Sequence, residues 1–234
     1  MSAAARLADP IEHTGSLTGL LAGLAVGAIA AALIVGTGGL AAIAIVGATA
    51  AAGAGIGQLI GSFSYFNHRT GQIVSGSGNV YINGKSAARA HLDKAGCNEH
   101  GSAPQIVAQG SGTVHINGQP AARVGDCTVC DAKISSGSGN VFIGGGTDTT
   151  DPINPEVPVW LERAILVVGL ASAFVLASPV IVIAGFAGGV AGGLAGNWAG
   201  GELFGEGSDQ QKLMAFGGAM LGGGLGAKGG KWFV

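Results

Sequence analysis

The sequence predicts a small all-β body of three short repeats, bound to a metal ion and flanked by two α-helical apolar regions. Three observations support this prediction. Charged residues are missing from two long stretches, one string recurs three times between them, and cysteine or histidine follows a repeated aspartate at a constant offset. In order, we expect a segment that completes the β body, a first helical hairpin, the β body, a Pro/Thr/Asp linker and a second helical region. Their bounds are 1–15, 16–66, 67–147, 148–159 and 160–230.

Glycine supplies 46 of the 234 residues, and charged residues supply only 10%, whereas a typical soluble domain carries about 25%. The hydrophobic content of 48% excludes intrinsic disorder, which requires low hydrophobicity and high charge. The net charge of −2 provides no basic field for a nucleic-acid partner. The composition therefore favours a protein that is associated with a membrane or covered by a partner, and it disfavours an ordinary soluble enzyme domain.

The first charge-free stretch covers residues 13–68 and has room for two helices, because one membrane-spanning helix needs about 20 apolar residues. We expect these transmembrane helices at roughly 17–35 and 40–60, joined by a glycine-rich turn at 36–39. The stretch is too long for a secretory signal peptide, and the acidic residues Asp9 and Glu12 precede it where such a peptide is basic.

The second charge-free stretch covers residues 164–201, and we expect Pro179 to kink or divide its helix. A third apolar stretch, 213–225, follows a helix cap near Ser208, but its glycines make it weak as an isolated helix. Buried core helices of a large soluble protein are the alternative, although apolar runs longer than about 18 residues favour a membrane. Glycines spaced four residues apart predict close helix packing, and they are Gly19, Gly23, Gly27, Gly188, Gly192 and Gly196.

The middle of the chain contains three copies of a nine-residue string that begins with Gly-Ser-Gly, at 76–84, 110–118 and 137–145. Each copy predicts a turn, a short strand of alternating side chains and a second turn. Valine and isoleucine share one face of each strand, and the residues on the opposite face are Tyr81, His115 and Phe142. Repeats this short cannot bury their own apolar faces, so the three copies are expected to pack together with pseudo-threefold character.

A second string, Ala-Ala-Arg followed by Asp, occurs at 4–9, 87–93 and 121–126. Two of these copies alternate with the Gly-Ser-Gly strings, whereas the first precedes the apolar hairpin. The N-terminal copy is therefore expected to supply a missing unit of the β body, with residues 16–66 inserted after it. Chance is the alternative, because the string is short and made of common residues.

The residue four positions after each repeated aspartate is a good ligand for a soft metal ion. The pairs are Asp9 with His13, Asp93 with Cys97, and Asp126 with Cys130. A C-x-x-H pair then adds His100 to Cys97 as a fourth ligand. Two cysteines and two histidines suit tetrahedral Zn(II) in a closed structural site. A small, glycine-rich β body has little core, and bound zinc would compensate for this.

Other residue groups give weaker signals. Cys127 and Cys130 form a C-x-x-C pair, but no βαβ pattern surrounds them, so redox activity is disfavoured. The arginines of the repeated string are expected to form internal salt bridges with its aspartates, and they are Arg6, Arg89 and Arg123. No nucleophile is paired with a base, and no glycine-rich turn has the pattern of a phosphate-binding loop. We therefore expect no enzymatic activity from residues 1–234.

The repeated strings resemble those of PAAR-repeat proteins, and residues 120–123 spell the name of that motif. Residues 4–14 are similar to the prePAAR motif of type VI secretion effectors. The resemblance implies a zinc-bound PAAR cone in which His13 joins the metal site. It also implies two partners: the VgrG spike trimer, on which the cone docks, and an Eag-type chaperone that shields the hydrophobic helices.

The apolar regions on both sides of the β body resemble the effector class with two transmembrane regions and a C-terminal toxin. No toxin domain is expected within residues 1–234. This class implies a protein that is cytoplasmic with its chaperone, is then secreted by the type VI system in interbacterial competition, and inserts in the recipient inner membrane to translocate the toxin. A resident membrane anchor or pore-forming protein with a small structural-zinc domain is the alternative.

Overall fold

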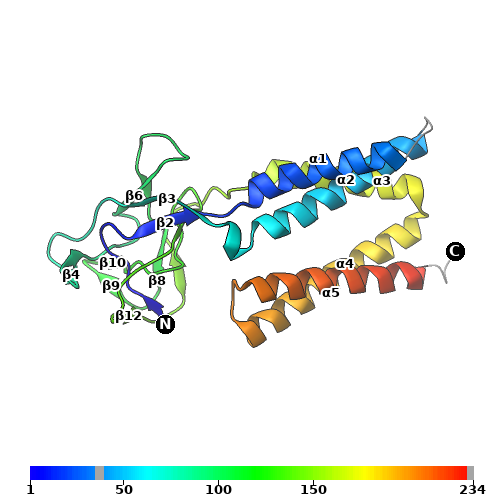
Figure 1. Cartoon of the computed structure of the whole chain (residues 1–234). Helices are drawn as coiled ribbons and strands as arrows, with labels where there is room; N and C mark the ends of the chain where they lie inside the picture. The colour runs from blue at the N-terminus through cyan, green and yellow to red at the C-terminus, as the bar shows by residue number, and fades with distance from the viewer. Residues whose placement is uncertain (35–39, 231–234) are drawn as a thin grey trace. The chain divides into compact units, whose positions relative to one another are not determined.

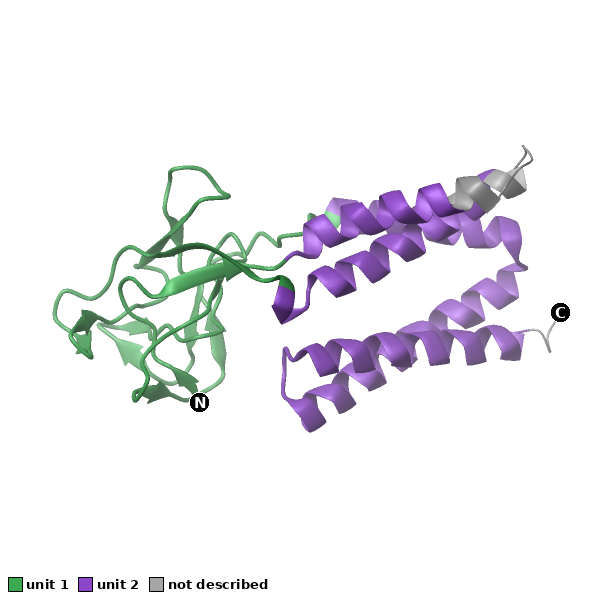
Figure 2. Cartoon of the chain, in the orientation of Figure 1, with its two compact units in different colours: residues 1–14, 66–159 green, residues 15–65, 160–234 purple. Residues whose placement is uncertain are grey.

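The computed structural model describes residues 1–34 and 40–230 (Figure 1). The chain divides into a β unit, Met1–Thr14 with Phe66–Val159, and a helical unit, Gly15–Tyr65 with Trp160–Val234 (Figure 2). The polypeptide therefore leaves the β unit after its opening segment, forms two helices, returns to build most of the β unit, and leaves it again.

The largest sheet of the β unit, every residue of which is described, has the antiparallel strand order β11-β2-β3-β6-β7. Its strands are β2 (Pro10–His13), β3 (His68–Ile73), β6 (Lys94–Cys97), β7 (Gln105–Ile106) and β11 (Lys133–Ile134). The smaller sheets pair β1 (Ser2–Ala3) with β12 (Phe142–Ile143), β4 (Tyr81–Ile82) with β5 (Lys85–Ser86), β8 (Gln109–Ser111) with β13 (Thr147–Thr149), and β9 (His115–Ile116) with β10 (Gln119–Pro120). Because β2 lies between β11 and β3, the N-terminal segment is an internal part of this sheet.

The three Ala-Ala-Arg strings meet in a ring of backbone hydrogen bonds. The Ala5 N–H donates to the Ala122 carbonyl (2.9 Å), the Ala122 N–H to Ala88 (3.0 Å), and the Ala88 N–H to Ala5 (2.9 Å). All three alanines are fully buried, which leaves no room for larger side chains at this ring. In this ring the N-terminal copy occupies the place of a third unit beside the other two copies, which gives the β unit its pseudo-threefold character.

The serine of each Gly-Ser-Gly string orders the turn before its strand. The hydroxyl oxygens of Ser77, Ser111 and Ser138 accept hydrogen bonds from the N–H of the valine three residues later, at 3.0 to 3.1 Å. The predicted alternation is confirmed at Tyr81 and Phe142, which are 60% and 57% exposed. The apolar residues that pack on the opposite, buried side are Val80, Ile82, Ile116, Val141 and Ile143. Val114 is 38% exposed and departs from the alternation.

The third copy of the string pairs differently from the other two. In the first two copies, Asn83-Gly84 and Asn117-Gly118 have positive φ at both residues, which is the geometry of a type I′ hairpin turn. In the third copy, β12 pairs instead with the N-terminal β1, in the register Ala3↔Phe142. The N-terminal segment thus provides the strand that a local hairpin provides elsewhere.

The predicted salt bridges of the repeated string are all present. The distance between a guanidinium nitrogen of the arginine and a carboxylate oxygen of the aspartate is 3.0 Å in Arg6–Asp9, 2.8 Å in Arg89–Asp93 and 3.1 Å in Arg123–Asp126. In each pair the aspartate also accepts the backbone N–H of the arginine, at 2.8 to 2.9 Å. These bonds satisfy carboxylates that are almost fully buried, so the string stabilises its own turn.

Residues 148–159, expected to be a linker, belong to the β unit. β13 pairs with β8 in the register Thr149↔Gln109, and the side chain of Val157 is buried. The composition suggested an extended connection, but this segment finds backbone partners and an apolar contact against the β unit.

The helical unit contains α1 (Ser16–Ile34), α2 (Leu40–Gly61), α3 (Val159–Leu176), α4 (Pro179–Phe204) and α5 (Asp209–Gly230). The predicted end of the first helix at residue 35 and the predicted turn at 36–39 lie outside the described residues. Pro179 divides the second apolar region, because α4 begins there. The Ser208 hydroxyl accepts the Gln211 N–H at 3.2 Å, so the predicted cap of α5 is also confirmed.

The glycines spaced four residues apart bring helix backbones into contact, as predicted. A Cβ atom added at Gly23 would lie 2.0 Å from the Gly53 carbonyl oxygen, and one at Gly192 would lie 2.1 Å from that of Gly218. Contacts this short do not exist between real atoms, so only glycine permits the antiparallel pairs α1–α2 and α4–α5. α5 forms a full helix despite its glycines because it packs along α4.

Three helical segments among the described residues are long and apolar enough to cross a membrane. They are Ile43–Gly61, Val159–Leu176 and Pro179–Phe204, and Ser16–Ala30 is a shorter apolar helix. Large apolar side chains on these helices are exposed, among them Val26, Ile43 and Trp198 at 66%, 70% and 71%. Surfaces of this kind indicate contact with a membrane or a partner.

Candidate metal centre

Three separate segments of the β unit bring the predicted ligands together. His13 is the last residue of β2, Cys97 is the last residue of β6, and His100 follows in the next turn. Cys130 comes from the turn that precedes β11. β2 pairs with both β3 and β11, and β3 pairs with β6, so the sheet itself gathers the ends of these strands.

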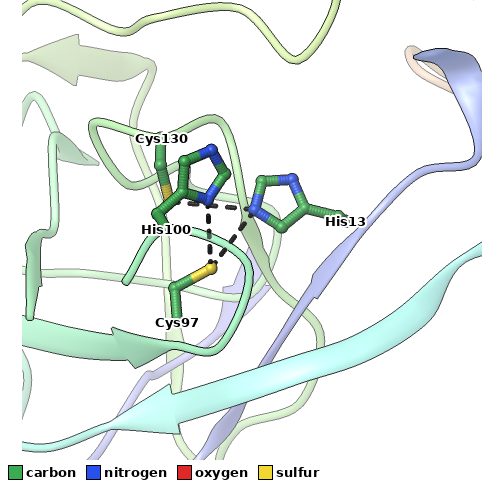
Figure 3. Close-up of side chains that lie close together, drawn as sticks. All are labelled: His13, Cys97, His100 and Cys130. Carbon is green, nitrogen blue, oxygen red and sulfur yellow. Dashed lines mark hydrogen bonds between the residues drawn. The ribbon is translucent and has the colours of Figure 1, made fainter. Parts of the chain in front are cut away.

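The four side chains point toward one another (Figure 3). The Cys97 Sγ lies 3.5 Å from the His13 Nε2 and 3.3 Å from the His100 Nδ1, and the Cys130 Sγ lies 3.8 Å from the His13 Nε2. One ligand atom from each of the four residues lies within 4.8 Å of all the others. Ligand bonds of zinc imply separations of about 3.4–3.8 Å between neighbouring corners of a tetrahedron. The donor set and its spacing therefore fit one tetrahedral zinc ion.

Burial prepares the donors for a cation. His13, Cys97 and Cys130 are buried, whereas His100 is exposed. Burial lowers the pKa of His13, which keeps its imidazole in the neutral form that binds metals. Burial also raises the pKa of the Cys130 thiol, so a bound cation is needed to hold it as thiolate. Metal binding at this site is expected to release protons.

Two polar residues near the cluster were not indicated by the sequence. The fully buried Thr128 places its hydroxyl oxygen 3.2 Å from the Cys130 Sγ and 3.2 Å from the Ala132 carbonyl oxygen. Glu99 accepts a hydrogen bond from His68 at 2.5 Å, which raises the pKa of His68. A threonine two residues before a ligand forms no recognisable pattern, so only the structure places Thr128 beside Cys130.

We expect Thr128→Val to weaken zinc binding about tenfold, because it removes the hydroxyl that lies 3.2 Å from the Cys130 Sγ, within reach to donate to a thiolate there, while preserving the shape of the side chain. Thr128→Ser keeps the hydroxyl and is expected to bind zinc like the wild type. Competition with a chromogenic chelator measures both affinities. Equal affinities for the Val and Ser variants would show that this hydroxyl does not support the metal ligand.

Cys127 lies outside the cluster although it forms a C-x-x-C pair with Cys130. Burial raises the pKa of its thiol to about 12, so Cys127 is almost entirely protonated at neutral pH. A thiol in this state is a poor nucleophile and a poor metal ligand.

Two models of known protein motifs match the chain. The model of the PAAR motif matches residues 66–136 and 106–147, and the model of the class I prePAAR effector Rhs1 motif matches residues 1–61. The prePAAR match covers the N-terminal segment and the first apolar hairpin, and it includes His13. The PAAR matches cover the part of the β unit that follows the hairpin, and they include Cys97, His100 and Cys130.

Several similar proteins are enzymes by name. The chain is 50% identical over 226 residues to the NAD(+)--protein-arginine ADP-ribosyltransferase Tre1 of Serratia proteamaculans, covering 95% of this chain and 50% of Tre1. It is 37% identical to the double-stranded DNA deaminase toxin A of Burkholderia cenocepacia, over 70% of this chain and 12% of that protein. It is 34% identical to the NAD(P)(+) glycohydrolase toxin Tse6 of Pseudomonas aeruginosa, over 73% of this chain and 43% of Tse6.

The expectation of a protein without enzymatic activity is contradicted by these relatives. That expectation rested on the lack of a paired nucleophile and base within residues 1–234. The chain spans about half the length of Tre1 and less of the other two relatives, so residues 1–234 correspond to only part of each enzyme.

Proposed function

Because this chain belongs to the proteins that carry a PAAR motif and a class I prePAAR segment, we propose that it is the delivery part of a type VI secretion effector. The observation that carries the proposal is the backbone ring in which Ala5, Ala88 and Ala122 complete one β unit. This ring joins a segment that precedes the apolar hairpin to segments that follow it, as a combined prePAAR and PAAR motif requires.

The β unit is proposed to dock on the VgrG spike trimer. Its three repeats present one exposed strand residue each, at Tyr81, His115 and Phe142, and these belong to the pseudo-threefold set of pairs β4–β5, β9–β10 and β1–β12. A partner with threefold rotational symmetry can offer the same contact to each repeat.

The helical unit is proposed to be covered by an Eag-type chaperone in the cytoplasm of the producing cell and to insert in the recipient inner membrane after secretion. Exposed apolar surface costs about 25 cal/mol per Å2 in water, so helices with so many exposed apolar side chains require a cover. The charged residues of the helices lie in or next to their first or last turns and leave the helix interiors free of charge. They are Glu162, Arg163, Glu202, Asp209, Lys212 and Lys228. Such interiors fit either a chaperone groove or lipid.

The proposed metal is one structural Zn(II), held by His13, Cys97, His100 and Cys130. Zinc bound by Cys and His in a closed site contributes its binding free energy to folding. This contribution suits a β unit whose strands are mostly two residues long.

We further propose that the whole protein is an enzymatic toxin that this region delivers. Tre1, the deaminase toxin and Tse6 share this region and carry three different enzyme names. The shared region therefore does not select the reaction. Assays of the full-length protein for each of these activities would identify it.

Co-expression tests the delivery proposal. With a cognate Eag-type chaperone, we expect a soluble complex from the cytoplasm of the producing cell, and without it we expect aggregated chain. The measurement is the amount of chain in the soluble, membrane and pellet fractions. Full solubility without any partner or detergent would contradict the proposal that the apolar helices need a chaperone. Stable integration in the producer's own membrane would instead support the resident anchor or pore-forming protein.

A further inference from the structure

The segment 150–157, which we call the clasp segment, folds against the metal-bearing part of the β unit. The Thr150 N–H and hydroxyl both donate to the Ala108 carbonyl, at 2.9 and 3.0 Å. Further along, the Asn154 N–H donates to the Val129 carbonyl at 2.8 Å, next to the ligand Cys130. The clasp segment ends at Val157, which is 6% exposed.

Glu156 of the clasp segment contacts two parts of the chain that adjoin the metal ligands. Its backbone N–H donates to the Asp131 Oδ2 at 3.1 Å, and Asp131 directly follows Cys130. Its carboxylate Oε2 accepts the Thr14 hydroxyl at 2.5 Å and the Thr14 N–H at 3.2 Å. Thr14 directly follows His13. One residue thus links the neighbours of two ligands that are 117 positions apart.

The ligand His13 needs such support more than the others. A metal-binding histidine is normally oriented by a hydrogen bond from its second ring nitrogen, but the buried His13 Nδ1 has no partner among the described residues. The pairing of β2 with β3 is also irregular near it, with a register shift between Ile11 and Glu12. The position of the imidazole therefore depends on its backbone, which the Thr14–Glu156 contact holds on the C-terminal side.

We propose that Glu156 is a positioning residue for the metal ligand His13 and acts through Thr14. The inference rests on the proposed zinc site. Thr14 lies just before α1, and Glu156 lies just before α3, so the contact joins the two points at which the chain leaves the β unit. The clasp segment thereby keeps the N-terminal segment in place where the apolar hairpin begins.

The rate of zinc release tests this inference. Zinc-loaded wild type and variants, in the chaperone complex, are mixed with excess chromogenic chelator. We expect Glu156→Ala to release zinc 10- to 100-fold faster than the wild type. Glu156→Gln keeps an oxygen acceptor for Thr14 and is expected to stay within about threefold of the wild type. Because either variant alone removes the Thr14–Glu156 contact, Thr14→Ala combined with Glu156→Ala is expected to release zinc no faster than the faster single variant.

Asp151→Asn is the matched control. Asp151 lies in the same clasp segment but pairs with His91, at 3.1 Å, and not with Thr14. We expect its zinc release to match the wild type. Equal acceleration by Asp151→Asn and Glu156→Ala would overturn the inference, because any loosening of the segment would then suffice. Release at the wild-type rate from Glu156→Ala would also overturn it while leaving the zinc site intact. A wild type that binds no zinc would instead refute the proposed site. The absorption of Co(II)-loaded protein reports whether each variant keeps four ligands.

Discussion

Replacing His13 with Ala is expected to abolish stable zinc binding, although His13 lies 84 positions from Cys97 in the sequence. His13 is 1% exposed and approaches both cysteine sulfurs, so its removal leaves the ion with three ligands and an open position. Under conditions that hold the free zinc concentration constant, a 1,000-fold loss of affinity removes about 4 kcal/mol of stability. The measurements are zinc content by mass spectrometry and thermal unfolding of the chaperone complex.

Cys127→Ala is the control for this experiment. Cys127 is as buried as many core residues and lies close in sequence to Cys130, but it is not part of the cluster. We expect this variant to lose some packing and to keep one zinc ion per chain. Unchanged zinc content in His13→Ala, or loss of zinc from Cys127→Ala, would contradict the ligand assignment.

The second large effect is expected at the glycines between α4 and α5. A Cβ added at Gly222 would lie 2.1 Å from the Gly188 carbonyl oxygen, so Gly222→Ala forces the two helices apart. Overpacking of this kind typically costs about 1–3 kcal/mol. We expect backbone amides of α5 to exchange hydrogen about tenfold faster in the chaperone-bound or detergent-solubilised chain, because tenfold corresponds to about 1.4 kcal/mol.

Gly224→Ala provides a control on the same helix, because its expected effect on the rate of hydrogen exchange has the opposite sign. An added Cβ at Gly224 meets no atom within 4 Å, and alanine favours a helix over glycine by about 1 kcal/mol. This variant is expected to slow exchange in α5 or leave it unchanged. If both alanine variants behave alike, close backbone contact does not hold α4 and α5 together.

Local patterns in the sequence predicted much of the fold. The charge-free stretches predicted the helices, and Pro179 separated two of them because its ring cannot continue a helix from the preceding turn. The four-residue glycine spacing predicted the contacts of Gly23 and Gly192, since residues four apart lie on one helix face. The offset between each aspartate and a ligand predicted the cluster, because the repeated string folds in the same way in each copy.

The failures of prediction occur where a residue depends on a distant partner. The linker expected at 148–159 became part of the β unit, because Val157 and the backbone of the clasp segment find partners there. Val114 was predicted to share the buried face of its strand, but it is 38% exposed. The expectation of no enzymatic activity is contradicted for a related reason, because the enzymatic relatives are recognised by comparison and not by a residue pattern in the sequence.

The amino-acid sequence alone was enough to specify the three repeats, the apolar helices and the four residues of the Cys and His cluster. These features depend on spacing along the chain, which sets the geometry of a strand, a helix or a turn. Tertiary structure alone decided that β2 lies between β11 and β3, that Thr128 lies beside Cys130, and that Thr14 contacts Glu156. Such contacts join segments separated by whole helices or turns, and they form only when burial and hydrogen bonding bring those segments to one place.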